Sequence, residues 1–445
     1  MKVFLGSFSN FDVLQKESTE IQPTMRKKLL DENEDAYRTM EEIINIADKG
    51  KSTLCSMGSQ KKPPFSLHDL HFIPAQISKI PRDTNEIVNT QVVIGPGAKK
   101  PLRVSSPIMI SGMSFGAVSK NVRLILAKVA SNLEIGLNAG EDTVLPEELD
   151  IASKQLIAQY PTVRIGITSE ILKRCSAVEI RFGQGAFPGW ESLLPGTKVS
   201  PEVAKLIGHK EAQDAYAPAH HPDIRNETEL KEKIRWLKEL TSGTPVGAKI
   251  GCGDIENDVE ILAEADADFV ALDGFGGGTG ATELFVRENV GVPIVATLPR
   301  ADKHLKKIGK RNKVSLIAGG GLRTSVDFAK CLALGADAVY IGTSALIAIN
   351  CQQYRICHTG QCPTGVTTND PVLLQQLNVD EGIRKLTNFM NVSNMEVANL
   401  ARIVGKDDVR KLGIEDLVAL KKDLAEVTGV KWLNGKVVPE NSVNQ

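Results

Sequence analysis

The stretch Ile317-Ala318-Gly319-Gly320-Gly321-Leu322-Arg323-Thr324-Ser325-Val326-Asp327 joins a short apolar segment to a helical pattern through three consecutive glycines. Another glycine follows the next apolar segment, in Ile341-Gly342-Thr343-Ser344. Glycine lets the backbone approach an anion closely, and successive N–H groups at a helix start bind phosphate. In (β/α)8 barrels the loops after the seventh and eighth strands form the usual phosphate site. The two stretches therefore predict a phosphate-binding barrel; two tight turns that need glycine only for positive φ are the simpler alternative.

Short apolar segments alternate with helical patterns between residues 107 and 346. We expect strands at residues 107–114, 135–140, 177–184, 245–251, 269–274, 293–298, 314–319 and 338–343. These segments are apolar on both faces, as buried parallel strands are. The alternation predicts an α/β protein with a (β/α)8 TIM barrel, because a doubly wound sheet needs fewer strands.

The segments on either side of the barrel differ from it in pattern. A polar helical pattern with an apolar stripe covers residues 24–51, and proline and turn residues are common over 61–100. After Ser344 a cysteine-containing loop and three helical patterns follow. We therefore expect an N-terminal extension that packs on the barrel, the barrel itself, a cysteine-rich loop and a C-terminal helical cap, over residues 1–105, 106–346, 347–369 and 370–445.

The composition excludes several classes of protein. The 445 residues contain 53 Lys and Arg against 54 Asp and Glu, which argues against a strongly basic nucleic-acid binder. Apolar stretches such as 345–349 fall far short of the ~20 residues that a membrane helix needs, and residues 1–10 show no secretory signal. Seven cysteines, an odd number, do not form a secreted disulfide framework, so we expect a reducing, cytoplasmic compartment.

Three of the cysteines are close together in the sequence. Cys351, Cys357 and Cys362 have the spacing C-x5-C-x4-C, and Pro363 follows the last. Closely spaced thiolates of this kind are typical ligands of iron–sulfur clusters. Three ligands suit a 3Fe-4S cluster, or a 4Fe-4S cluster with one open iron; zinc with His358 as a fourth ligand and three unrelated thiols are the alternatives. The other four cysteines are expected in the core or in turns: Cys55, Cys175, Cys252 and Cys331.

A third glycine cluster follows the fifth expected strand, in Asp273-Gly274-Phe275-Gly276-Gly277-Gly278-Thr279-Gly280-Ala281. It meets the dinucleotide-binding spacing only if Ala281 replaces the last glycine, and that fingerprint follows a first strand. We interpret the cluster as an active-site loop at the mouth of the barrel, with a flexible turn as the alternative.

Together with further motifs, these loops resemble the FMN-binding synthase domain of glutamate synthases. The motifs that carry the resemblance are Ser111-Gly112-Met113-Ser114-Phe115-Gly116, Asn138-Ala139-Gly140-Glu141, Gly183-Gln184-Gly185-Ala186, Leu194-Pro195-Gly196-Thr197-Lys198-Val199, Gly277-Gly278-Thr279-Gly280-Ala281 and the cysteine loop. The resemblance extends from about residue 72 to about residue 404. It implies an FMN barrel in which electrons pass from an iron–sulfur cluster to the flavin. Reduced flavin then gives hydride to the imine formed from 2-oxoglutarate and ammonia.

The resemblance also implies roles for individual residues. Lys249 ends the expected fourth strand, where a cation stabilises the reduced flavin or a substrate carboxylate. Gln184 ends the expected third strand and can hydrogen-bond the flavin ring edge. Glu141 is expected to orient ammonia or the imine, although a structural N-cap role is an equal alternative. The residues expected to bind FMN are Gly112, Met113, Ser114, Gln184, Lys249, Gly320, Gly321, Arg323, Gly342 and Thr343.

The substrate is expected to lie among residues of the third and fifth strand ends. Arg181, placed nominally on the opposite face from Gln184, is a candidate carboxylate partner or a structural residue. Thr279 and Gly280 are expected to border the substrate. Where the family continues with Lys-Pro-Gly, this chain has Phe187 and Trp190 within residues 187–192. These apolar residues favour a less anionic or bulkier substrate.

The chain also predicts partners. Residue 2 is Lys2, not a cysteine nucleophile, so we expect free ammonia, an amine or a separate amidotransferase subunit to supply nitrogen. An electron donor such as ferredoxin or a reductase subunit is expected, and the basic run from Lys303 to Lys313 is a candidate dock or a solvated helix face. Two functional alternatives remain: an N-methylglutamate synthase-like subunit that uses methylamine and glutamate, and a non-catalytic electron-transfer subunit. The oligomeric state is open.

Overall fold

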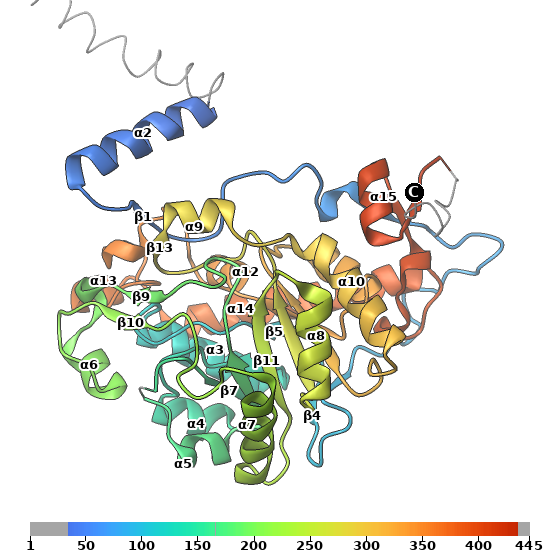
Figure 1. Cartoon of the computed structure of the whole chain (residues 1–445). Helices are drawn as coiled ribbons and strands as arrows, with labels where there is room; N and C mark the ends of the chain where they lie inside the picture. The colour runs from blue at the N-terminus through green and yellow to red at the C-terminus, as the bar shows by residue number, and fades with distance from the viewer. Residues whose placement is uncertain (1–33, 165, 435–445) are drawn as a thin grey trace, which may run out of the picture. The chain divides into compact units, whose positions relative to one another are not determined.

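Eight parallel strands form a closed barrel in the computed structural model, which describes residues 34–164 and 166–434 (Figure 1). In order around the barrel they are β5 (Ile108–Ile110), β6 (Leu137–Asn138), β7 (Leu156–Tyr160), β8 (Ala177–Arg181), β11 (Val246–Gly251), β12 (Phe269–Asp273), β14 (Ser315–Gly319) and β15 (Ala338–Ile341). The last strand pairs with the first, with Tyr340 opposite Met109. The predicted (β/α)8 barrel is confirmed.

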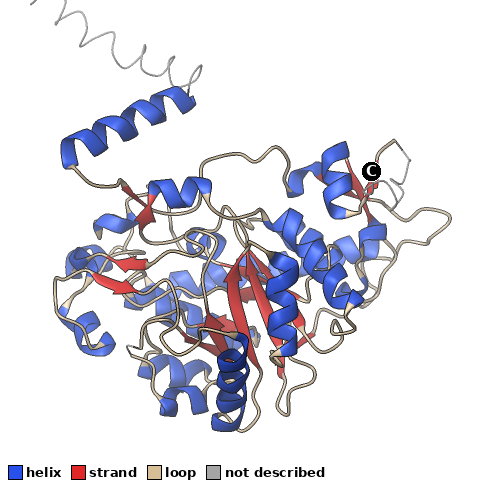
Figure 2. Cartoon of the chain, in the orientation of Figure 1, coloured by secondary structure: helices blue, strands red, loops and turns tan. Residues whose placement is uncertain are grey.

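Helices surround these strands (Figure 2). They are α3 (Lys120–Leu133), α4 (Pro146–Ala152), α5 (Ser169–Arg174), α7 (Glu227–Leu240), α8 (Ile255–Glu264), α10 (Ile294–Lys307), α11 (Ser325–Ala333) and α14 (Val379–Ile403). Buried residues recur at helical spacing, as in Leu230, Ile234 and Leu237 of α7, which gives each helix an apolar face toward the strands. Because α14 packs on both α3 and α11, it takes the place of the helix after β15.

Within the barrel, one expected strand is wrong and one strand was missed. Residues 293–298 begin the helix α10, in which every residue from Ile294 to Pro299 is buried. An apolar run buried on all sides has no period that distinguishes a helix from a strand. The missed strand is β7, whose polar Gln159 points into the barrel and interrupts the apolar pattern. Both errors precede β14, so β14 and β15 are the seventh and eighth barrel strands, as expected. Arg181 and Lys249 follow the missed strand and precede the false one. They therefore lie on the fourth and fifth strands, not on the third and fourth.

The strands that were expected to reach residues 114, 140 and 184 are shorter. In the structure they end at Ile110, Asn138 and Arg181. The residues that follow each of these ends therefore lie in loops at the carboxyl ends of the strands. This is the end of a barrel at which active sites are built.

The opposite end of the barrel is closed by a hairpin. β3 (Val92–Ile94) pairs antiparallel with β4 (Leu102–Val104), and their buried side chains pack on Met109, Phe269 and Ile317 of the barrel interior. This apolar plug leaves only the carboxyl ends of the strands open to a ligand.

Segments outside the barrel pair with one another across the sequence. β2 (Leu70–Phe72) pairs with β16 (Leu417–Ala419), which pairs with β17 (Lys431–Trp432). Residues of the expected N-terminal extension and C-terminal cap thus share one small sheet.

The remaining elements are β1 (Leu54–Cys55), β9 (Ser192–Leu194), β10 (Ala215–Ala217), β13 (Thr282–Glu283), α6 (Pro201–Ile207), α9 (Leu284–Asn289), α12 (Thr343–Ala348), α13 (Pro371–Leu374) and α15 (Lys422–Thr428), with short 3-10 turns at Leu67–Asp69, Gly196–Lys198, Cys357–Thr359, Val409–Lys411 and Ile414–Asp416.

Residues 34–53 belong to a unit that is separate from the rest of the described chain. Within it, α2 (Glu34–Lys49) confirms the second part of the helix expected over residues 24–51, and residues 24–33 lie outside the described part. Among the residues that the structure describes, no helix has the length and apolar character that a membrane span requires.

A buried ion pair holds two barrel helices and two loops together. Arg123 of α3 donates two hydrogen bonds of 2.5 Å to Glu148 of α4, and it also donates to the carbonyls of Met113 and Thr143. Both charged side chains are about 2% exposed or less. Removing one partner leaves the other charge buried and unpaired, which is strongly destabilising.

We therefore expect Arg123→Met to lower the free energy of unfolding by about 3–5 kcal/mol in urea denaturation. The matched control is Arg174→Met, which removes the exposed Arg174–Asp150 pair and should change stability by less than about 1 kcal/mol. Equal effects of the two substitutions would contradict the structural role of Arg123.

Candidate functional site

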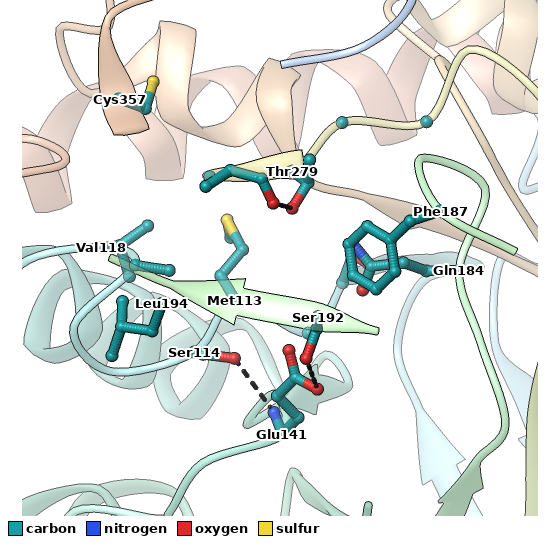
Figure 3. A pocket seen from close by; sticks show the side chains of 18 of the residues that line it. Met113, Ser114, Val118, Glu141, Gln184, Phe187, Ser192, Leu194, Thr279 and Cys357 are labelled. Atoms are coloured by element: carbon teal, nitrogen blue, oxygen red, sulfur yellow. Dashed lines mark hydrogen bonds between the residues drawn. The ribbon is translucent and has the colours of Figure 1, made fainter. Parts of the chain in front are cut away.

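One large pocket opens at the carboxyl ends of the barrel strands. It encloses about 1480 Å³ of space free of protein atoms, part of which is open to solvent. The loops after β5, β6, β8, β12, β14 and β15 all contribute to its wall. Most residues expected in the site line it: Gly112, Met113, Ser114, Glu141, Gln184, Lys249, Thr279, Gly280, Gly320, Gly321, Arg323, Gly342, Thr343, Cys351 and Cys357. Figure 3 shows Met113, Glu141, Gln184, Thr279 and Cys357 around this space.

Backbone from two loops forms one end of the pocket. Gly320 has φ of +105°, and a Cβ there would lie 2.5 Å from the backbone nitrogen of Gly274, so only glycine fits. At Gly342 the nearest heavy atom to an added Cβ is the Ser111 Cβ at 3.8 Å, an ordinary van der Waals distance, so this glycine is not crowded by other protein atoms. Arg323, two residues after Gly321, also lines the pocket. A cradle of this kind, with a cation beside it, fits a phosphate group.

Charged groups from the barrel interior form the floor. Lys249 lies 3.4 Å from the Asp273 carboxylate and is 4% exposed. Deeper in the barrel, Glu179 accepts hydrogen bonds of 2.8 Å from Asn138 and Gln159. Burial raises the pKa of Glu179, and the Lys249 charge opposes that rise. The Lys249 ammonium therefore interacts with the part-buried Asp273 carboxylate and with the buried Glu179 carboxyl group.

Glu141 is held by three neighbours. Its carboxylate lies 2.8 Å from the Arg181 guanidinium and accepts a hydrogen bond of 2.9 Å from Ser192, and its backbone N–H donates to Ser114 Oγ (Figure 3). Arg181 also donates to Gln184 Oε1 at 3.4 Å. Arg181 is 3% exposed and does not line the pocket. The structure therefore brings Arg181 and Gln184 together instead of placing them on opposite faces, and the guanidinium lies behind Glu141.

The next residue, Asp142, is one that the sequence reading missed. It lines the pocket, and its Oδ2 is shielded from solvent without a hydrogen-bond partner in the described part of the chain. Burial and the Glu141 charge raise the pKa of Asp142 to about 8, although Arg123, Arg181 and Lys198 act in the opposite direction. A helical or strand pattern gives no signal for such a residue, because its role comes from burial.

Lys198 is a second residue whose position only the fold reveals. Its side chain is buried, lines the pocket near Gly280, and donates to the Ala117 carbonyl at 2.6 Å. Burial lowers the pKa of Lys198 to about 8, against the nearby charges of Cys357, Cys362 and Asp142. The ammonium thus lies between the cysteine loop and the acidic pair.

The loop that departs from the family pattern forms a largely apolar wall. Phe187 is 1% exposed, lines the pocket, and packs over the Arg181 guanidinium at 5.2 Å. Leu194 of β9 and Ile207 of α6 continue this wall. Trp190 does not reach it: its ring packs edge-on against Phe285, and its Nε1 donates to Glu283. Of the two aromatic residues singled out from the sequence, Phe187 alone lines the pocket.

The three clustered cysteines lie in one loop beside the pocket. Cys351 and Cys357 line it, and Cys362 is 7% exposed. Burial would raise the pKa of Cys362, but hydrogen bonds from Thr364 and Thr367 outweigh it and lower the pKa to about 7. A thiol with a lowered pKa is a good metal ligand. Burial raises the pKa of Cys351. It likewise raises the pKa of the expected core cysteines, to about 11 in Cys55 and in the same direction in the other three.

The backbone of this loop is strained and anchored. Asn350, Gln353 and Arg355 have φ of 117°, 57° and 60°, a region that non-glycine residues rarely adopt. His358 Nδ1 lies 2.6 Å from Ser56 Oγ, which also accepts from the His358 backbone N–H. Such strain persists where the surrounding structure holds the chain in place.

Within residues 34–164 and 166–434, no three His, Cys, Asp or Glu side chains are gathered closely enough to hold one metal ion. With Zn–S bonds of about 2.3 Å, a zinc site needs sulfurs within about 4 Å of one another. A cluster of several irons separates its thiolates further. The iron–sulfur and the zinc alternatives therefore both stay predictions.

A short N-terminal segment was also missed. The backbone N–H of Met57 donates to the Thr279 carbonyl at 2.7 Å, and Met57 lines the pocket. The preceding residue, Ser56, anchors the cysteine loop, and Cys55 pairs with Thr282 between β1 and β13. This segment therefore connects the glycine-rich loop to the cysteine loop, which no local motif indicates.

The basic run from Lys303 to Lys313 lies elsewhere. It covers the end of α10 and the approach to β14, at the end of the barrel opposite the pocket. Lys306 pairs with Asp302 at 2.6 Å, and Arg311 pairs with Asp302 and Asp337. Several charges of this run are therefore paired within the chain, as expected for a solvated helix face instead of a dock for an electron donor.

Comparison with protein families matches residues 39–407 to the conserved region in glutamate synthase. A glutamate synthase large subunit-like protein of Rhizobium meliloti is 36% identical over 422 residues, which cover 89% of this chain and 95% of that protein. An archaeal-type glutamate synthase [NADPH] of Thermotoga neapolitana is 34% identical, covering 87% and 82%. An archaeal glutamate synthase [NADPH] of Methanocaldococcus jannaschii is 38% identical, covering 74% and 66%.

Solved structures with the same fold share little sequence. A chimera of (S)-mandelate dehydrogenase is similar with a TM-score of 0.52 and 15% identity, covering 80% of this chain and 89% of that chain. A lactate oxidase of Pediococcus acidilactici gives a TM-score of 0.52 with 13% identity, covering 80% and 84%. These likenesses concern the barrel fold.

Proposed function

The chain belongs to the glutamate synthase family, and we propose that it is an FMN- and iron–sulfur-dependent oxidoreductase that forms a C–N bond at the α-carbon of a 2-oxo acid. One observation carries the proposal. A single pocket is lined by the glycine cradle, by the Lys249 cation and by two of the three clustered cysteines. The glycine cradle would bind the phosphate of a cofactor, Lys249 would mark the reacting centre, and the cysteines would mark the site where electrons enter. All three therefore line one cavity.

FMN would lie with its phosphate on the backbone of Gly320, Gly321, Gly342 and Thr343, beside Arg323. When bound, FMN supplies hydride transfer to the imine carbon. Lys249 would face the ring, held by Asp273 and by the interior charge of Glu179. Gln184, oriented by Arg181, would hydrogen-bond the ring edge, with Gly112, Met113 and Ser114 on the facing wall.

The thiolates of Cys351, Cys357 and Cys362 would hold the cluster, in the 3Fe-4S form or in a 4Fe-4S form. When bound, it supplies single electrons. Residues 352–354 of the same loop are exposed, so an electron donor such as ferredoxin or a reductase subunit would approach here, not at the basic run.

The 2-oxo acid would lie between Thr279–Gly280 and the apolar wall. An ammonium has three donors, and Ala117 takes one from Lys198, so Lys198 is the pocket cation best placed for the substrate carboxylate. Phe187, at the position where the family has a lysine, removes a charge from the opposite wall. We therefore expect a substrate with one carboxylate, or a bulkier one, to be used better than 2-oxoglutarate.

The proposal is tested by purifying the holoprotein anaerobically, photoreducing it, and following reoxidation of its visible absorbance. We expect reoxidation by a 2-oxo acid together with ammonium or methylammonium, and by a preformed cyclic 2-imino acid. The non-catalytic alternative predicts that neither addition reoxidises the protein. Methylamine with glutamate as the only effective pair would instead favour the N-methylglutamate synthase-like alternative.

We expect Cys357→Ser to remove most of the iron and to lower donor-driven turnover at least tenfold, because electrons no longer reach the flavin. Reoxidation after photoreduction should persist, since that assay bypasses the cluster. Iron content, visible spectra and both rates check the prediction. Cys175→Ser, in a thiol whose pKa burial raises to about 12, is the control and should retain its iron. Undiminished donor-driven turnover in Cys357→Ser would take the cluster out of the electron path.

A further inference from the structure

Two neighbouring carboxyl groups, Glu141 and Asp142, lie at the pocket, and only Glu141 has both an ion-pair partner and a hydrogen-bond partner for its carboxylate. Glu141 is engaged by Arg181 at 2.8 Å and by Ser192 at 2.9 Å. Asp142 lines the same pocket, and its shielded Oδ2 accepts no hydrogen bond within the described residues. A buried acceptor without a partner is costly, so it points to a donor that arrives with the ligand.

The cations that face Asp142 are committed to other partners. Arg123 is bound to Glu148 and to two carbonyls, and Arg181 is bound to Glu141. Lys198 donates to the Ala117 carbonyl and lies close enough to Asp142 for their charges to interact. A 2-oxo acid whose carboxylate is bound by Lys198 would therefore have Asp142 near its reacting end.

We propose that the Asp142 carboxyl binds the nitrogen of the incoming amine and transfers the protons of its condensation with the 2-oxo acid. This inference rests on the proposed function. It adds an acid and base, the Asp142 carboxyl, for the condensation that precedes reduction of the imine. An N–H of the amine would satisfy the buried Oδ2.

The step balances with Asp142 as the only acid and base. Protonated Asp142 gives its proton to the carbonyl oxygen as the amine nitrogen bonds to the carbon. The resulting carboxylate takes a proton from that nitrogen and returns it to the hydroxyl group, which leaves as water as the C=N bond forms. Asp142 regains its proton from the next ammonium ion, which thereby becomes the nucleophilic amine. No oxidant or reductant takes part.

The charge state of Asp142 suits this order. Burial and Glu141 raise its pKa to about 8, against Arg123, Arg181 and Lys198, so the carboxyl is protonated at neutral pH and loses its proton as the pH rises through 8. Condensation should therefore slow as the pH rises through 8. Lys198, whose pKa is also about 8, contributes to the same limb, so the rate below pH 7, where Lys198 keeps its charge, separates the two groups.

The test measures condensation without any redox step. Imine formation and its reversal exchange the carbonyl oxygen of the 2-oxo acid with water, so ¹⁸O loss from labelled pyruvate and 2-oxoglutarate is followed by mass spectrometry. The holoprotein is compared with Asp142→Asn and with Asp150→Asn, an exposed carboxylate of α4 that serves as the matched control. Ammonium and methylammonium chloride are the amine probes, from pH 6 to pH 9.

We expect amine-dependent exchange in the wild type and in Asp150→Asn, and at least a tenfold loss in Asp142→Asn between pH 6 and pH 7, below the pKa of Lys198. After photoreduction, the preformed cyclic imino acid should reoxidise Asp142→Asn within twofold of the wild-type rate, which shows that the variant site is intact. Wild-type exchange rates in Asp142→Asn would overturn the inference, and so would the absence of amine-dependent exchange in the wild type. Failure of the preformed imine to reoxidise the wild type would instead count against the proposed function.

Discussion

Replacing Lys249 by methionine should lower kcat by about 10²–10³-fold, the usual cost of removing one fixed group that stabilises developing charge. Lys249 is 4% exposed, ends in the pocket 3.4 Å from Asp273, and opposes the pKa rise of Glu179. Methionine retains most of the side-chain volume but leaves both carboxyl groups without this cation. The loss should therefore appear mainly in kcat.

The measurement compares steady-state rates, flavin content and thermal stability of Lys249→Met with those of Lys128→Met, an exposed lysine of α3. Lys128→Met should match the wild type. Lys249→Arg, which keeps the charge, should recover part of the rate. A Lys249→Met protein with full flavin content and wild-type kcat would exclude Lys249 from the reacting centre.

Gly320→Ala should destabilise the fold by about 2–6 kcal/mol and abolish retention of flavin. The φ of +105° costs about 1–3 kcal/mol for a residue with a side chain. The new methyl group would also lie 2.5 Å from both the nitrogen and the oxygen of Gly274, and such overlap with backbone costs a further 1–3 kcal/mol or so. Relief of this clash must move the loop that is expected to bind phosphate.

Alanine substitutions at two other glycines distinguish the cost of backbone strain from the cost of steric overlap. Gly309 has φ of +70° with no atom near an added Cβ, so Gly309→Ala should show backbone strain alone, about 1–2 kcal/mol. Gly97 has neither constraint, so Gly97→Ala should change stability by less than about 0.5 kcal/mol. Urea unfolding and flavin content check the series. A Gly320→Ala protein as stable as Gly309→Ala, with its flavin retained, would contradict the cradle.

Much of the site was predictable because its signals are local. The glycines after β14 and β15 and the triplet Cys351, Cys357 and Cys362 are consecutive or nearly so, and each carries its own chemistry. The glycine loops follow the seventh and eighth barrel strands, as predicted, because the false strand and the missed strand both precede β14 and leave its position in the count unchanged. The barrel itself was predictable because parallel strands buried on both faces are continuously apolar.

Other parts of the site have no local signal. Gln159 in β7 is polar because it binds Glu179 inside the barrel, and this hid the strand. Arg181 and Gln184 have sequence positions that suggest opposite faces, but β8 ends at Arg181, so the strand period no longer applies beyond it. Met57 is distant in sequence from the loop that its backbone binds.

The sequence by itself determined the barrel, the glycine loops of the expected phosphate site, the cysteine triplet and the membership of a family, since these depend on residue type, spacing and apolar pattern. Only the tertiary structure decided which of the expected residues meet. It placed Arg181 behind Glu141, Phe187 but not Trp190 in the pocket wall, and the basic run at the far end of the barrel. It alone singled out Asp142 and Lys198. The physical reason is that the burial that shifts the pKa of both side chains, and the unpartnered Oδ2 of Asp142, arise from neighbours that only folding brings together.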